Sequence, residues 1–134
     1  MRALTLRIAV VDDEPDVLEL LRLILEHNGF AVIPVSHPDK ARQVETVHHP
    51  DIFLIDLMLP GITGVDLARD LRGTTCPHTP MIAMSASRQM LEQAERSQLF
   101  QATLAKPFDV VTLLDQVQWC APERAASNGR MGKN

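Results

Sequence analysis

The chain has 134 residues, 46% of them hydrophobic, which is enough for one domain with a core that needs no disulfide or structural metal. A formal net charge of -4 disfavours a nucleic-acid surface, because no basic stripe is available to neutralise phosphates. Cys76 and Cys120 lack the paired spacing of a zinc site and fit a reducing compartment. No segment is long and apolar enough to span a membrane, so we expect a cytoplasmic protein without membrane contact.

The first part of the chain predicts a strand, a helix, a second strand and a second helix. The apolar run 8–11 is typical of a strand. The helix after it begins near Pro15, whose missing N–H costs nothing in a first helical turn. Gly29 suits the left-handed residue after its end. A strand over 31–35 and a helix over 39–47 follow.

The rest of the chain repeats this alternation three times. Residues 52–56 form an unbroken apolar run ending in a carboxylate, which is typical of a strand buried on both faces. The elements predicted after it are a helix over 64–71, a strand over 81–84, a helix around 90–94, a strand over 102–105 and a helix over 110–119. The alternation predicts a doubly wound α/β fold, a parallel sheet with helices on both faces. We expect one domain over 1–120 and a disordered tail or linker over 121–134.

Polar residues stand at the carboxyl ends of the predicted strands. Asp12 and Asp13 follow the first strand and Asp56 ends the third. Ser85 follows the fourth strand and Lys106 the fifth. Because these ends share one edge of a parallel sheet, we expect the five side chains to meet in one crevice, where ligands bind in open α/β sheets.

This set of groups suits phosphoryl transfer onto a carboxylate. The three carboxylates repel one another and Lys106 offsets only one charge, so we expect Mg²⁺, with Asp13 and Asp56 as candidate ligands and Asp12 acting through water. Asp56 would attack the phosphorus and become an aspartyl phosphate. The metal and Lys106 would stabilise the charge on the phosphoryl oxygens, and Ser85 would hydrogen-bond one of them.

Four motifs in this order resemble the receiver domain of bacterial two-component response regulators. They are Val-Val-Asp-Asp-Glu-Pro at 10–15, Asp-Leu-Met-Leu-Pro-Gly-Ile-Thr-Gly at 56–64, Met-Ser-Ala at 84–86 and Lys-Pro-Phe at 106–108. The resemblance spans roughly residues 5 to 118. It implies a flavodoxin-like fold of five parallel strands in the order 2-1-3-4-5.

The resemblance also implies roles for particular residues. Asp56 would accept a phosphoryl group from a histidine kinase or histidine phosphotransfer protein, with Lys106 and Ser85 as its catalytic partners. Asp12, Asp13, Asp56 and the Met58 main-chain carbonyl would bind Mg²⁺. The Lys106-Pro107 peptide would be cis. Receivers often carry an aromatic residue three positions before the lysine; this chain has Thr103 there, so no rotating aromatic side chain is implied.

The expected function is therefore a phosphorylation-controlled signalling switch rather than an enzyme, acting on a downstream protein or output domain of unknown identity and compatible with a phosphorylation-dependent homodimer. A small aspartyl-phosphate phosphotransferase is one alternative, but it would need a substrate pocket or cap insertion for which 134 residues leave no room. A phosphate-independent pseudo-receiver scaffold is another, and it is disfavoured because every site residue is present.

Overall fold

The structure is a computed structural model that describes residues 5–74 and 77–121. Cys76 and the predicted tail beyond residue 121 lie outside the described residues. Within them, one five-stranded parallel sheet has the order β2-β1-β3-β4-β5. The strands are Arg7–Val11 (β1), Ala31–Val35 (β2), Ile52–Asp56 (β3), Met81–Ser85 (β4) and Ala102–Ala105 (β5). The predicted strand order is confirmed.

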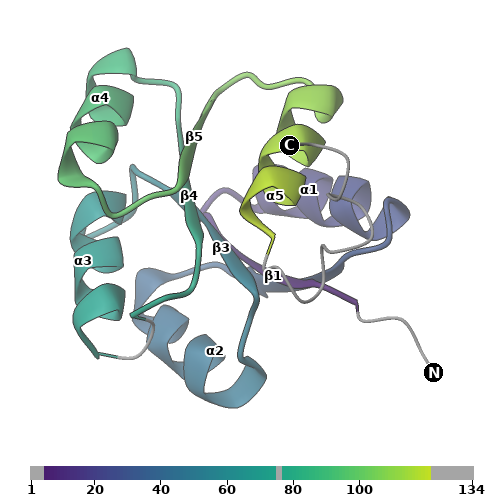
Figure 1. Ribbon diagram of the computed structural model, residues 1–134, viewed down its shortest axis with the longest axis horizontal. Helices are drawn as coiled ribbons and strands as arrows, with labels where there is room; N and C mark the ends of the chain where they lie inside the picture. Colours follow the sequence, from purple (N-terminus) through teal and green to yellow (C-terminus); the bar gives the residue numbers. More distant parts are fainter. Residues whose placement is uncertain (1–4, 75–76, 122–134) are drawn as a thin grey trace.

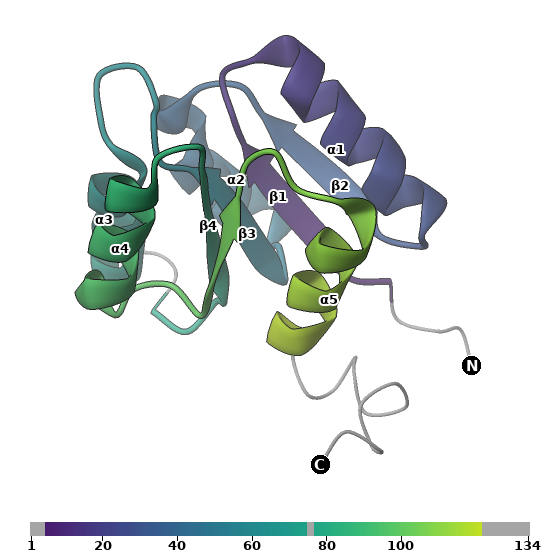
Figure 2. The same ribbon diagram turned by 90° about the horizontal axis from the view of Figure 1, so that it is seen from above.

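The helices cover both faces of this sheet, as Figures 1 and 2 show. They are Pro15–His27 (α1), Ala41–His48 (α2), Gly64–Thr74 (α3), Arg88–Ser97 (α4) and Val110–Cys120 (α5), with a short 3-10 turn at Pro38–Lys40. Helices α1 and α5 lie on one face, and α2, α3 and α4 lie on the other. Each face has its own aliphatic core, so the doubly wound α/β architecture is confirmed.

Two interior strands of the sheet, β3 and β4, are buried along their whole length. Such burial is expected for strands covered by helices on both sides. One consequence is that Asp56 and Ser85, the last residues of these strands, are buried polar groups.

None of the helices in the described residues is long and apolar enough to cross a membrane.

Local sequence signals set the ends of several helices. Pro15 is the first residue of α1, and Gly29 beyond its end has a φ of 93°, a conformation that glycine adopts without strain. The Ser87 hydroxyl accepts the Met90 N–H at the start of α4. Asp109 accepts the Thr112 N–H at the start of α5. Such caps satisfy N–H groups that have no partner within the helix.

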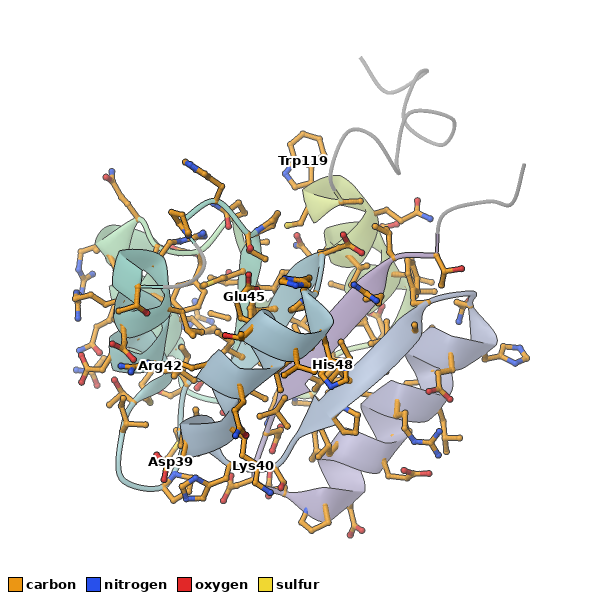
Figure 3. The ribbon with its side chains drawn as sticks, turned by 90° about the horizontal axis from the view of Figure 1, so that it is seen from below. Asp39, Lys40, Arg42, Glu45, His48 and Trp119 are labelled. Atoms are coloured by element: carbon orange, nitrogen blue, oxygen red, sulfur yellow. The ribbon has the colours of Figure 1, made fainter. Side chains whose placement is uncertain are left out.

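One helix boundary differs from the prediction, and two apolar residues of predicted helices are exposed. Helix α3 continues to Thr74, three residues beyond the predicted end, because the glycine at position 73 is tolerated within a helix. Val47, which helped to predict α2, is 67% exposed; this short helix reaches the core through Ala41 and Val44, one turn earlier. Trp119 lies on the outer side of α5 and extends away from the domain (Figure 3).

Candidate functional site

The register of the sheet aligns the ends of four strands. Val11 of β1 pairs with Ile55 of β3, and Asp56 pairs with Met84 of β4. Asp12 and Asp13 come directly after Val11, and Asp56 is itself the last residue of β3. Ser85 comes directly after Met84 and pairs with Ala105 of β5, which Lys106 follows. The structure therefore brings Asp12, Asp13, Asp56, Ser85 and Lys106 to one edge of the sheet, as expected for carboxyl ends of parallel strands.

Lys106 connects the outer part of the sheet to its centre. Its Nζ donates to Asp56 Oδ2 at 3.0 Å and to Asp12 Oδ2 at 3.2 Å. A third carboxylate, Glu14 Oε1, lies 3.8 Å from the same nitrogen. The side chain reaches past β4, since β5 is separated by that strand from β3. The expected cis Lys106-Pro107 peptide is present.

Asp56 is held at both carboxylate oxygens. Oδ2 accepts from Lys106, and Oδ1 accepts the Met58 N–H at 3.0 Å. The residue is only 5% exposed. Met58 itself pairs with Thr63 in an isolated antiparallel bridge, which closes the loop between β3 and α3. Asp56 is therefore fixed in orientation at the end of its strand, while the role of the Met58 carbonyl as a metal ligand stays a prediction.

The three aspartates form a compact set of oxygen donors. Asp12, Asp13 and Asp56 each offer a carboxylate oxygen within 4.8 Å of the other two. Asp12 and Asp56 are buried and Asp13 is exposed at the mouth. Hard oxygen donors with one side open to water match the preference of Mg²⁺, which keeps several of its waters. The residues present therefore fit the predicted cation.

Ser85 is almost fully buried at the end of β4. Its Oγ accepts the Ser87 N–H at 3.0 Å, and its carbonyl accepts the Lys106 N–H at 2.9 Å. The cap of α4 is Ser87 rather than Ser85, so helix capping does not account for the Ser85 hydroxyl. That hydroxyl keeps its own hydrogen to donate, as its predicted role requires.

Burial and repulsion work against the charge on Asp12. Burial raises the pKa of Asp12, and the Asp56 charge raises it further. The Glu14 N–H and the Lys106 ammonium act in the opposite direction without restoring the ordinary value. Burial opposes the charge of Lys106 too, but its contacts with Asp56 and Asp12 outweigh that effect and raise the Lys106 pKa.

These shifts lead to an expected gain in stability for Asp12→Asn. An acid whose folded-state pKa is raised stabilises the fold below its ordinary pKa, and this contribution is lost as the pH rises through the raised value. At neutral pH and without divalent cations, the substitution removes a buried, repelled charge and should raise Tm by a few degrees. Thermal unfolding across the acidic to neutral range tests this, with exposed Asp66→Asn as control. A lower Tm for Asp12→Asn at neutral pH would contradict it.

Sequence reasoning missed two residues at this edge. Glu14 was part of a quoted motif but had no assigned role, and it approaches Lys106. Gly64 also had no role, yet a Cβ there would lie 2.6 Å from the Asp56 carbonyl oxygen. The signal for Glu14 is its place beside two aspartates. No local signal distinguishes Gly64, because the contact depends on where α3 begins against β3.

Thr103 occupies the position that is often aromatic in receiver domains. Its side chain makes a polar contact. Its Oγ1 donates to Glu95 Oε2 at 3.3 Å, which joins β5 to α4. Glu95, Thr103 and Trp119 help to line a surface hollow of about 320 Å³ between α4 and α5.

Comparison with known proteins agrees with this geometry. The family described as response regulator receiver domain matches residues 8–118. The transcriptional regulatory protein ResD of Bacillus subtilis (strain 168) is 35% identical over 106 residues, which cover 76% of this chain and 42% of ResD. KdpE of Mycobacterium tuberculosis (strain H37Rv) is 38% identical over 79 residues, 59% of this chain and 34% of that protein. The chain thus spans less than half the length of these relatives.

Solved structures show the same fold. The BeF3-activated N-terminal receiver domain of Klebsiella pneumoniae RstA has a TM-score of 0.77 at 27% identity, covering 85% of this chain and 97% of that one. TrrA of Thermotoga maritima, solved in complex with Mg(2+)-BeF, has a TM-score of 0.78 at 24% identity, covering 87% and 99%. With the family match over most of its length, the chain belongs to the response regulator receiver domain family, which is consistent with a phosphorylation-controlled switch.

Proposed function

We propose that Asp56 accepts the phosphoryl group that controls this switch, and that the donor is a phosphohistidine of a histidine kinase or histidine phosphotransfer protein. The observation that carries the proposal is the arrangement of Asp56, a buried carboxylate whose two oxygens are held by Lys106 Nζ and the Met58 N–H. It lies at the edge of the sheet where ligands bind in such folds.

The transfer is a displacement at phosphorus. An Asp56 carboxylate oxygen forms a bond to the phosphorus while the phosphorus–nitrogen bond of phosphohistidine breaks. The imidazole leaves with the bonding electron pair and takes up a proton. Lys106, already 3.0 Å from Asp56, offsets charge on the transferred oxygens, and the Ser85 hydroxyl is placed to donate to one of them.

Mg²⁺ would be held by Asp13 and Asp56, through water by Asp12, and by the Met58 carbonyl. When bound, it supplies positive charge against the phosphoryl oxygens. The support is the set of three carboxylates within 4.8 Å of one another, of which one ammonium neutralises only a part.

The chain acts as a switch and catalyses only its own phosphorylation and dephosphorylation. The phosphoryl group would change the affinity of the domain for a downstream partner or for a second copy of itself. The Thr103–Glu95 hydrogen bond between β5 and α4 offers a contact that could rearrange in place of a rotating aromatic side chain.

The decisive experiment compares the wild type with Asp56→Asn. We expect the wild type, incubated with Mg²⁺ and a small phosphodonor, to gain one phosphoryl group by intact-mass measurement. Asp56→Asn should gain none, because the amide has no anionic oxygen to attack phosphorus. Omitting Mg²⁺ should suppress the gain in the wild type.

Asp66→Asn serves as the matched control, because Asp66 is an exposed carboxylate on α3 that forms an ion pair with the neighbouring Arg69. It should gain phosphate as the wild type does. Phosphorylation of Asp56→Asn at the wild-type rate would overturn the assignment of the acceptor. An unmodified wild type would favour a scaffold without phosphate, and steady turnover of a metabolite phosphate would favour an enzyme.

A further inference from the structure

Glu14 is a charged residue at the candidate site that the proposed chemistry does not use. Its backbone N–H donates to Asp12 Oδ1 at 2.9 Å, which fixes its position in the loop after β1. It precedes the first residue of α1, but its side chain makes no capping hydrogen bond. The carboxylate is instead directed toward Lys106, at 3.8 Å from Nζ.

The Glu14 contact adds little to folding. At 3.8 Å it is longer than a hydrogen bond, and the Glu14 side chain is 63% exposed. Such surface ion pairs stabilise a protein weakly. Lys106 also has two shorter carboxylate contacts, to Asp56 and Asp12. The main consequence of Glu14 is therefore electrostatic: it extends the negative charge of the site to its solvent-facing mouth.

That charge lies close to Asp56, the proposed acceptor. Glu14 Oε1 and Asp56 Oδ2 contact the same nitrogen, so the two oxygens are separated by at most about 7 Å, a range over which charges still interact in a partly buried site. A donor bound at Asp56 therefore lies within range of the Glu14 charge. Its cost of approach rises with its own negative charge.

We propose that Glu14 is a specificity-determining residue that discriminates among phosphodonors by charge, disfavouring those with more negative charge. This inference rests on the proposed role of Asp56. Removing the Glu14 charge should also weaken the hold on the Lys106 side chain. That change in Lys106 should alter the rates for all donors by a similar factor. The ratio of the rates for two donors of different charge therefore isolates the discrimination.

Two probes differ in charge while delivering the same group. Acetyl phosphate is a dianion at neutral pH, and its phosphorus–oxygen bond breaks to release acetate. Phosphoramidate carries less net charge, and its phosphorus–nitrogen bond breaks to release ammonia. In both reactions one bond forms between the phosphorus and an Asp56 oxygen.

We expect Glu14→Gln to raise the second-order rate constant for acetyl phosphate relative to that for phosphoramidate by roughly three- to ten-fold. Added salt should shrink the difference between the wild type and the variant, because the mouth of the site is exposed and screened. Glu92→Gln removes the same charge from an exposed position on α4 and should leave the ratio unchanged.

The outcomes distinguish the role of Glu14 in donor specificity from the role of Asp56 as acceptor. An unchanged ratio in Glu14→Gln, or the same change in Glu92→Gln, overturns the role of Glu14 while leaving Asp56 as acceptor. A wild type that gains no phosphoryl group from either donor overturns the acceptor and, with it, this inference.

Discussion

Gly64→Ala should unfold this domain at a temperature lower by on the order of 10 °C. A Cβ at this position would lie 2.6 Å from the Asp56 carbonyl oxygen and 2.7 Å from Leu57 Cα. Both are backbone atoms at the buried end of β3, so neither can move without disturbing the sheet. Over-packing of this kind costs about 1–3 kcal/mol, and we expect the upper part of that range because Gly64 also donates its N–H to Leu57.

The same substitution should impair phosphoryl transfer even in protein that remains folded. Relief of the clash requires α3 to retreat or the end of β3 to shift, and the second movement displaces Asp56 from Lys106. Thermal unfolding measures the first effect. The initial rate of phosphorylation well below the Tm of the variant measures the second.

Gly73→Ala is the matched control, because it makes the same change in the same helix. No atom of the described residues lies within 4 Å of a Cβ at position 73, and alanine favours a helix over glycine by about 0.5–1 kcal/mol. We expect a small rise in Tm and an unchanged rate of phosphorylation. Equal Tm shifts in the two variants would show that contact with β3 is not what requires a glycine at position 64.

The fold and the position of the site were predictable because both follow from the alternation of strands and helices along the chain. Runs such as 52–56 are typical of strands covered on both faces, and parallel strands align their carboxyl ends. Asp56 and Lys106, 50 positions apart, therefore had to approach one another. The prediction needed only the order of the elements, not the details of packing.

Contacts made by long side chains across several elements could not be predicted in this way. The contact between Lys106 and Glu14 depends on how the loop after β5 lies relative to the loop after β1. The pairing of Thr103 with Glu95 depends on how α4 lies over β5. Local patterns describe which face of an element is buried, but not which partner a flexible polar side chain meets there.

Arg72 is the clearest example of a long side chain whose partners could not be predicted from local sequence patterns. It lies near the end of α3, and its guanidinium donates to the Leu99 carbonyl at 2.8 Å and to the Thr79 carbonyl at 2.6 Å. It also donates to Gln101 Oε1 at 3.0 Å, and that oxygen accepts the Met81 N–H at the start of β4. One side chain thus joins α3 to the segments that lead into β4 and β5.

Arg72→Met should lower the free energy of unfolding by about 2–4 kcal/mol. Hydrogen bonds to a charged donor contribute about 1.5–3 kcal/mol each, and the carbonyls left behind are partly shielded from water. Arg72→Lys should fall between the wild type and Arg72→Met, since an ammonium keeps the charge but lacks the planar fork that reaches several acceptors. Chemical denaturation of the three proteins gives the values directly.

Arg69→Met is the control for removing an arginine from the same helix. Arg69 makes one exposed ion pair with Asp66, at 3.0 Å, and such pairs contribute less than about 1 kcal/mol. If Arg72→Met is no more destabilising than Arg69→Met, then the hydrogen bonds between α3 and the two loops are not holding the amino edge of the sheet together. If it is, the loss should also speed hydrogen exchange at the Met81 amide, because Gln101 would no longer be held in place to accept its N–H.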